Sequence, residues 1–208
     1  MRSITKGVEP NSLAEHRARP YSNYDNYQDK DDLRTALVNE QCGLCCYCMS
    51  RIRGDAAAMR IEHWRSQANH PDDQLVYRNL LGACNGGEGQ PLRLQCCDTR
   101  KRNLGLRWNP ANPDHQIETR VRYDPDGTIR ADDIEFDQQL NQALNLNLPM
   151  LKNNRKSVLT AVLDWWRENR PVAHERIERE IHWRTMSNGD LPPYCQVAVW
   201  WLRKELPE

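Results

Sequence analysis

The sequence has no long apolar run and no net charge. None of its hydrophobic stretches approaches the roughly 20 residues that a membrane-spanning helix requires, and its polar start lacks the features of a signal peptide. We therefore expect a cytoplasmic chain with no membrane association. Lysine and arginine together number 29, as do aspartate and glutamate. A protein that holds nucleic acid alone is usually strongly basic, so any such role here needs a local basic patch or a partner that shares the binding.

The sequence is also poor in hydrophobic residues, which make up 38% of its 208 residues, whereas charged residues make up 28%. These values predict a globular protein with one modest core, or a small module wrapped by a second lobe. The chain shows no internal repeat, low-complexity tract or clear linker. A shift in composition near residues 110–130 is the best candidate for a boundary.

Cysteine, in contrast, is abundant and unevenly distributed. Seven of the eight cysteines lie between Cys42 and Cys97, and only Cys195 lies elsewhere. In a cytoplasmic protein such a cluster favours metal or redox chemistry over disulfides. A redox site of the thioredoxin type needs a strand–helix setting that is missing here, so we expect a metal site.

Cys45 and Cys48 form a C-x-x-C pair, the spacing that lets two thiolates reach one tetrahedral zinc ion. We expect Cys84 and Cys97 to complete a structural zinc site, because the glycine-rich segment between them is flexible enough to bring its two ends together. The sequence leaves two alternative ligands open, Cys42 and Cys96. It also permits the interpretation that all of these thiols are free and buried.

Hydrophobic spacing and turn residues predict the secondary structure. Residues 1–30 are expected to form an irregular, tyrosine-bearing arm that lies over the core or over a partner. The other expected elements are a helix at 31–41 capped by Asp31 or Asp32, a strand at 59–64, a helix start or tight turn at 77–84, a hairpin within 121–129, a helix through 151–165 that Pro171 ends, a helix at 172–186, and a last helix after Pro192 and Pro193.

Polar residues with catalytic potential are interleaved with the cysteines. In chain order they are Glu62, His63, Asn79 and Asp98, and the last of them directly follows Cys97. Each is weak evidence alone, but their order and spacing together resemble the HNH, or ββα-metal, endonucleases that contain a zinc knuckle. The resemblance implies an α+β fold of three parts: an N-terminal arm at 1–30, a zinc-braced HNH nuclease core at 31–115, and a hairpin with a mainly helical C-terminal lobe at 116–208.

The residue types suit hydrolysis of a phosphodiester bond, which needs an activated water and stabilisation of the charge that builds on the phosphate. His63 suits the general base, because a neutral imidazole accepts a proton near pH 7. Glu62 and Asp98 are expected to ligate a catalytic Mg²⁺ or Mn²⁺ ion, which prefers oxygen ligands. Asn79 would hold the His63 ring by a hydrogen bond, and His70 looks like a surface residue.

A run of basic residues follows Asp98. We expect Arg100, Lys101 and Arg102, with Arg107 close behind, to form the local basic patch that contacts the phosphate backbone. The alternative is that this run is only a solvated face of the protein.

The resemblance extends over nearly the whole chain and points to the HNH subunits of Septu-type anti-phage systems, including those attached to retrons. It implies a bacterial defence effector that cleaves nucleic acid, DNA in the first place, together with an ATPase of the ABC/SMC type. In a retron setting, a reverse transcriptase and its small DNA would join the complex. The segments that carry the resemblance are 1–7, 45–48, 61–63, 79–81, 97–98, 109–110, 123–127 and 144–147, followed by Arg155.

Two departures from the family pattern affect the site. Cys96 stands where a histidine is expected before Cys97, and Asp98 replaces a more usual histidine. The fourth zinc ligand and the choice of catalytic metal are therefore open. Two further interpretations also stay open: a zinc-stabilised binding module in which Glu62 and His63 are structural, and a nuclease that cuts RNA such as host tRNA.

Overall fold

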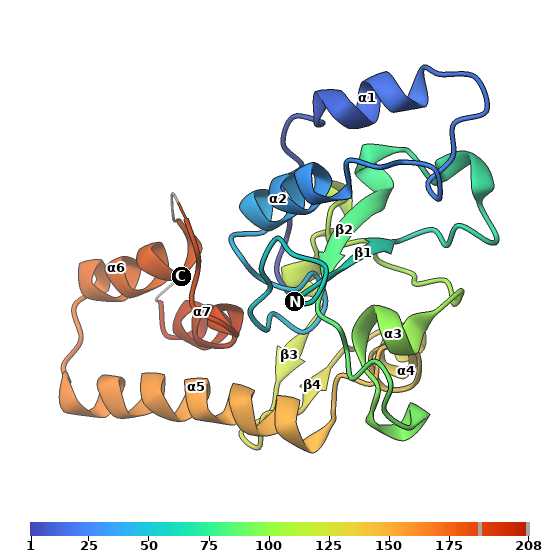
Figure 1. Cartoon of the computed structure of the whole chain (residues 1–208). Coiled ribbons are helices and arrows are strands. Elements are labelled where there is room, and N and C mark those ends of the chain that lie inside the picture. The colour runs from blue at the N-terminus through green and yellow to red at the C-terminus, as the bar shows by residue number, and fades with distance from the viewer. Residues whose placement is uncertain (187–188, 207–208) are drawn as a thin grey trace.

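The computed structural model describes residues 1–186 and 189–206 and has a mixed helical and β architecture (Figure 1). Two antiparallel pairs of short strands lie in the middle of the molecule, and helices surround them. The α+β prediction is therefore confirmed at this coarse level. None of the described helices combines the length and the apolar character that crossing a membrane requires.

The first pair of strands carries two of the predicted site residues at one end. β1 (Arg60–His63) confirms the strand expected at 59–64. β2 (Leu80–Ala83) pairs with it in antiparallel register, so that His63 lies opposite Leu80. The end of β1 is thereby held in place by backbone hydrogen bonds to a buried neighbour.

The prediction of a helix start or tight turn at 77–84 is wrong for most of that segment, which is a strand. A 3₁₀ turn at Tyr77–Asn79 leads directly into β2. All four residues of β2 are buried. A short apolar run that is buried on both faces shows no alternation, so periodicity alone does not distinguish a strand from a helix there.

The second pair of strands is the hairpin that the turn residues predict, and the structure confirms it. β3 (Arg122–Tyr123) and β4 (Ile129–Arg130) pair antiparallel, and the Gly127 amide donates to the Asp124 carbonyl across the turn at 2.9 Å. Gly127 has a φ of +83° and lies against the Lys152 backbone where any side chain would collide. Glycine is therefore required at this turn.

The N-terminal segment is not irregular throughout, which corrects the expectation for 1–30. It contains α1 (Asn11–Arg17). Leu13 and Tyr27 are fully buried and pack with apolar residues of α2 (Lys30–Glu40). A helix of seven residues is too short to show a clear periodicity, and such a helix depends on tertiary packing for its stability. The arm thus covers the core of its own chain.

α2 confirms the helix expected at 31–41, but its start differs in detail. Asp29, rather than Asp31 or Asp32, is the residue that precedes the helix. Asp31 and Asp32 lie in the first turn, where their negative charges favour the positive end of the helix dipole.

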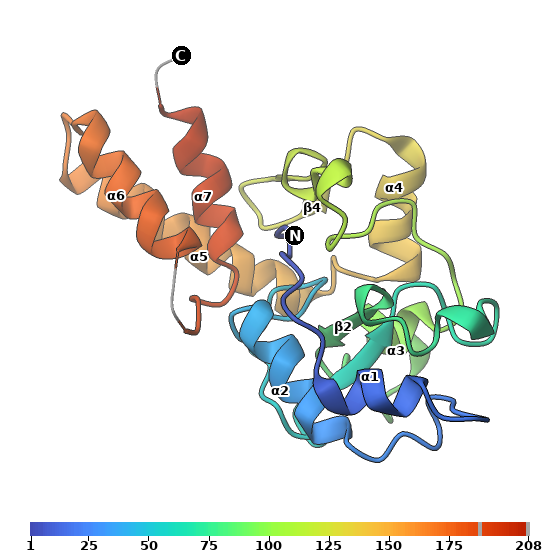
Figure 2. The ribbon, with the colours of Figure 1, turned by 90° about the horizontal axis from the view of Figure 1, so that it is seen from above.

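The C-terminal part is mainly helical, as predicted. It contains α5 (Pro149–Glu168), α6 (His174–Thr185) and α7 (Cys195–Lys204). α7 packs against both α5 and α6, and Figure 2 shows these three helices together on one side of the molecule. Earlier in the chain lie α3 (Cys97–Lys101) and α4 (Ile134–Gln138), which continues as a π-helical turn at Gln139–Ala143. Further 3₁₀ turns occupy Pro71–Asp73, Leu92–Leu94, Pro113–His115 and Ile117–Thr119.

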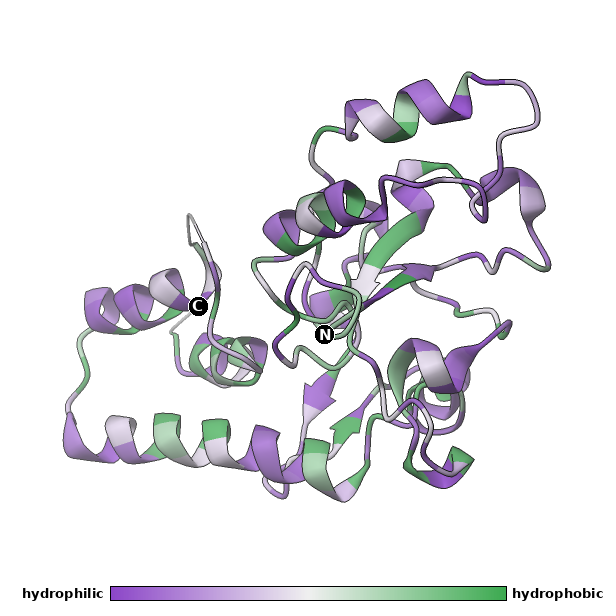
Figure 3. Cartoon of the chain, viewed as in Figure 1, coloured by the Kyte–Doolittle hydropathy of each residue, from purple (hydrophilic) through white to green (hydrophobic). Residues whose placement is uncertain are grey.

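One large hydrophobic cluster runs through the chain from Met1 to Leu202. It includes buried residues of all three predicted parts, among them Ile4, Tyr47 and Phe136. Figure 3 shows hydrophobic residues along β2 and α7, whereas α6 is mostly hydrophilic. The division into three parts stays a prediction, because the packing is continuous between them.

Candidate active site and metal centre

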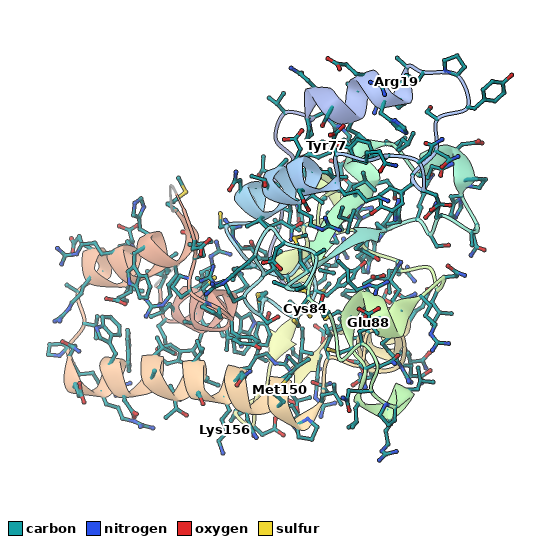
Figure 4. The ribbon with its side chains drawn as sticks, viewed as in Figure 1. Arg19, Tyr77, Cys84, Glu88, Met150 and Lys156 are labelled. Atoms are coloured by element: carbon teal, nitrogen blue, oxygen red, sulfur yellow. The ribbon has the colours of Figure 1, made fainter. Side chains whose placement is uncertain are left out.

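Four cysteines meet at one point in the interior. The Sγ atoms of Cys45, Cys48, Cys84 and Cys97 all lie within 4.8 Å of one another. The Cys45–Cys97 and Cys48–Cys84 sulfur distances are 3.9 and 3.7 Å, and a tetrahedral zinc ion with Zn–S bonds of about 2.3 Å places its sulfurs roughly 3.8 Å apart. The predicted set is therefore positioned to bind a metal ion, consistent with structural zinc. Figure 4 labels Cys84 near the centre of the molecule.

The four sulfurs come from three different elements. Cys45 and Cys48 lie in the loop between α2 and β1, which turns back where the Met49 amide donates to the Cys45 carbonyl at 3.1 Å. Cys84 directly follows β2, and Cys97 is the first residue of α3. A metal ion at this point would hold the loop, the first strand pair and α3 together.

The segment between Cys84 and Cys97 folds back on itself, as the expected closure requires. The Cys96 amide donates to the Gly86 carbonyl at 2.8 Å. Gly86 and Gly87 have φ values of +54° and +74°, and a side chain on Gly86 would collide with the Cys96 carbonyl. The glycines are needed because they permit this left-handed turn and this close approach.

Cys42 and Cys96 are not part of the four-sulfur group that the described residues form. Cys96 is buried beside that group, and hydrogen bonds with the thiols of Cys84 and Cys97 lower its pKa to about 4. Cys42 is only half-buried and packs in a separate small cluster with Cys195. The first-choice ligand set is thus the one that the geometry brings together.

A cavity of about 440 Å³ opens between β1 and α3. It collects three of the four predicted catalytic residues, and Asn79 is not among the described residues that line it. Figure 4 labels Glu88, another lining residue, over α3. The lining residues are Arg60, Glu62, His63, Ser66, Gln67, Glu88, Gly89, Gln95, Asp98, Thr99, Arg102 and Asn103.

Glu62 is buried almost completely, with 1% of its surface exposed. Its Oε1 atom accepts a hydrogen bond from the Tyr47 hydroxyl at 2.6 Å and lies 2.8 Å from the Lys101 ammonium. Burial raises the pKa of Glu62 well above its ordinary value, and the nearby Asp98 carboxylate raises it further, whereas Lys101 opposes the shift. Two carboxylates are therefore held together at the wall of the cavity.

Asp98 is the half-buried partner of this pair, in the first turn of α3. Its Oδ2 atom accepts a hydrogen bond from Arg60 Nε at 2.9 Å, and the Arg60 guanidinium also pairs with Glu88 at 2.5 Å. Sequence reasoning missed Arg60. The signal was present, because residues two apart on a strand share one face and Arg60 stands two residues before Glu62.

His63 ends β1 and is nearly buried, with 9% of its surface exposed. Its Nε2 atom lies 3.1 Å from the Gln74 carbonyl oxygen, and the Tyr24 ring packs edge-on against it with 4.5 Å between ring centroids. Because a carbonyl oxygen only accepts, Nε2 carries the hydrogen and the neutral ring has its lone pair on Nδ1. Burial lowers the pKa of His63, which favours this neutral form.

Asn79 does not orient the His63 ring directly, which corrects the expected role. Its amide accepts from the Arg65 backbone N–H at 2.8 Å and donates to the backbone carbonyls of Arg65 and Asp73 at 3.0 and 3.1 Å. Asn79 therefore closes the loop between β1 and β2. That loop carries Gln74, so the effect on His63 is indirect.

The basic run after Asp98 does not form one exposed patch. Lys101 is fully buried and ion-paired with Glu62, so its expected role in binding the phosphate backbone is wrong. Lys101 is the fourth residue after Cys97, and this spacing places both on the buried face of α3. Arg102 is exposed at the cavity rim and suits that role, whereas Arg100 is half-buried.

Three other residues named in the predictions, Arg100, Arg107 and His70, lie away from the cavity wall. Arg100 donates to the backbone carbonyls of Leu92 and Gln142, and the exposed Arg107 pairs with Glu135 at 2.7 Å. His70 is exposed, as expected. Neither Arg100 nor Arg107 lines the cavity in the described part of the chain.

No model of a protein family matches the chain, and no curated protein matches it.

Proposed function

We propose that this chain is a metal-dependent endonuclease of the HNH type that hydrolyses phosphodiester bonds of nucleic acid. The observation that carries the proposal is that Glu62, His63 and Asp98 converge on one cavity. The chain order β1, β2, α3, with four cysteines joining these elements, supports it, because the resemblance to zinc-braced HNH nucleases implies this order.

In this proposal His63 is the general base. With the hydrogen on Nε2, the Nδ1 lone pair is the atom that takes a proton from water. The bond from Nε2 to the Gln74 carbonyl strengthens as the ring becomes positively charged, so the carbonyl stabilises the protonated base. Tyr24 packs against the ring and limits its rotation.

Glu62 and Asp98 fit a divalent cation. The adjoining Asp98 carboxylate raises the pKa of Glu62, and two carboxylates held this close are a favourable site for a doubly charged ion. Their oxygens suit Mg²⁺ or Mn²⁺. Such an ion, when bound, would stabilise the charge on the phosphate and on the leaving oxygen. Arg102 at the cavity rim would contact a neighbouring phosphate.

The substrate and the partner belong to the same proposal. The formal net charge of zero leaves the chain with little general attraction for nucleic acid, so we propose that an ABC/SMC-type ATPase supplies much of the grip. In this setting the chain acts as the nuclease of an anti-phage complex, with a reverse transcriptase and its small DNA as further components in a retron.

The test is a cleavage assay of the full chain, alone and assembled with its ATPase, on duplex DNA, single-stranded DNA and total tRNA. We expect Mg²⁺-dependent cleavage of DNA that excess chelator abolishes. Cleavage of tRNA alone would change the substrate to RNA. No cleavage of any substrate by the assembled complex, with zinc bound and folding intact, would favour the zinc-stabilised binding module.

At saturating Mg²⁺ the pH profile of cleavage should have its acid limb below pH 6.5, and less Mg²⁺ should move this limb to higher pH. Cleavage needs His63 in its neutral form, and burial lowers the pKa of this residue. Activity is therefore retained as the pH falls, until the pH reaches that lowered pKa. Glu62 has a raised pKa, so protons compete with the cation as the pH falls, and more Mg²⁺ should move the limb lower. Measuring kcat/KM from pH 5 to 8 at two Mg²⁺ concentrations checks this; a limb at or above pH 6.5 that ignores Mg²⁺ contradicts it.

A further inference from the structure

Tyr47 lies between two of the clustered cysteines in the chain and is aimed at the candidate catalytic carboxylate. It occupies the position just before Cys48 in the C-x-x-C pair. The side chain is completely buried, and its hydroxyl donates to Glu62 Oε1 at 2.6 Å. The residue thus extends from the loop that holds Cys45 and Cys48 to Glu62, which lines the cavity.

Lys101 approaches the same oxygen from another cysteine-bearing element. It lies in α3, the helix that Cys97 begins, and is completely buried. Its ammonium is 2.8 Å from Glu62 Oε1 and donates to the His63 carbonyl at 3.1 Å. Lys101 therefore ties α3 to the end of β1, where the candidate base and the candidate ligand adjoin.

Packing alone does not account for these polar groups. Tyr47 belongs to the hydrophobic cluster, where phenylalanine would fill the same space without a hydroxyl to satisfy. A buried lysine–glutamate pair is costly to desolvate, and apolar residues of similar volume are often as stable or more so. Both polar groups converge on one oxygen of Glu62, which leaves its other oxygen free of these two contacts.

We propose that Tyr47 and Lys101 are positioning residues that hold Glu62 Oε1, so that the second carboxylate oxygen is presented to a divalent cation shared with Asp98. The inference rests on the proposed function. Because Tyr47 adjoins Cys48 and Lys101 shares a helix with Cys97, the cysteine centre acts on the cavity through them. Groups that orient metal ligands in this way typically contribute 10- to 100-fold to metal affinity.

The test uses the full chain with Tyr47→Phe, which removes one hydroxyl and preserves the ring. The matched control is Tyr77→Phe, because the Tyr77 hydroxyl donates to Glu40 at 2.7 Å, a similar tyrosine–glutamate bond away from the cavity. Mn²⁺ binding is followed by the electron paramagnetic resonance of the free ion, zinc content by mass spectrometry, and cleavage by kcat and the apparent KM for Mg²⁺.

We expect Tyr47→Phe to keep its zinc, to bind Mn²⁺ about 10- to 100-fold more weakly, and to raise the apparent KM for Mg²⁺ by a similar factor. Saturating Mg²⁺ should restore most of kcat, and Tyr77→Phe should match the unaltered chain. The positioning is read from Tyr47→Phe alone, because Lys101→Met would also remove a positive charge that opposes a cation beside Glu62.

Unchanged Mn²⁺ affinity in Tyr47→Phe would overturn the positioning role, and so would loss of zinc, which would make Tyr47 a structural part of the cysteine loop. Both results leave the proposed function intact if the unaltered chain binds Mn²⁺ and cleaves. If the unaltered chain neither binds Mn²⁺ nor cleaves, the proposed function fails and this inference fails with it.

Discussion

Replacing His63 with alanine is expected to lower the rate of phosphodiester cleavage by about 10²- to 10⁴-fold, the usual contribution of a general base. The effect should appear in kcat, because His63 acts on the attacking water rather than on binding. Zinc content should not change, since His63 is not one of the four clustered ligands. Single-turnover cleavage at saturating Mg²⁺, with zinc measured on the same sample, checks both parts.

The matched control is His70→Ala. His70 is an exposed histidine close to His63 in the sequence, and it is not one of the described residues that line the cavity. It should cleave like the unaltered chain. If His63→Ala retains full cleavage while it is folded and loaded with zinc, then His63 is not the base. If the unaltered complex also lacks cleavage, Glu62 and His63 are structural and the binding-module interpretation gains support.

Replacing Cys84 with serine is expected to remove the zinc and to lower the thermal midpoint of unfolding by at least roughly 10 °C. Structural zinc sites contribute apparent binding free energies of about 10–16 kcal/mol in small peptides, as much as the whole stability of a typical protein. For chains of this size each 1 kcal/mol shifts the midpoint by about 2–4 °C. The four cysteines come from the loop before β1, the end of β2 and the start of α3. Loss of the metal should therefore also disorder the cavity that lies between β1 and α3.

The control for this variant is Cys42→Ser, because Cys42 is a half-buried cysteine outside the four-sulfur group. It should keep its zinc and its melting temperature within a few degrees. Mass spectrometry of bound metal and a thermal melt followed by circular dichroism check both variants. A Cys84→Ser chain that still holds stoichiometric zinc would mean that Cys96, the neighbouring thiol, replaces the missing ligand.

Local features of the sequence were sufficient for several elements. The alternation in β1, the turn residues between β3 and β4, and the helical spacing of α5 each reflect interactions within a few residues, so they are visible without the fold. The pair Cys45 and Cys48 was predictable for a similar reason, because the spacing in a C-x-x-C pair is a local constraint on how thiolates reach one ion. The sequence left the other two cysteines open, and only the fold brings Cys84 and Cys97 to this pair.

Features that depend on contacts between distant segments were not predictable. β2 is a strand because it pairs with β1. α1 is ordered because its residue Leu13 packs against apolar residues of α2. Lys101 was expected on the surface, as a lysine in a basic run usually is. Its burial follows from the position of Glu62, 39 residues earlier in the chain, whose charge it neutralises.

The sequence by itself therefore determined the C-x-x-C pair, the candidate residues near the cavity and most helices, because each depends on residue types and their spacing along the chain. Only the tertiary structure decided the roles within the site. It assigns the His63 hydrogen to Nε2 through Gln74, directs Asn79 to the backbone, and directs Tyr47 and Lys101 to Glu62. These roles depend on which atoms face each other across the fold, and a buried charge or amide takes the partner that folding brings within hydrogen-bond distance.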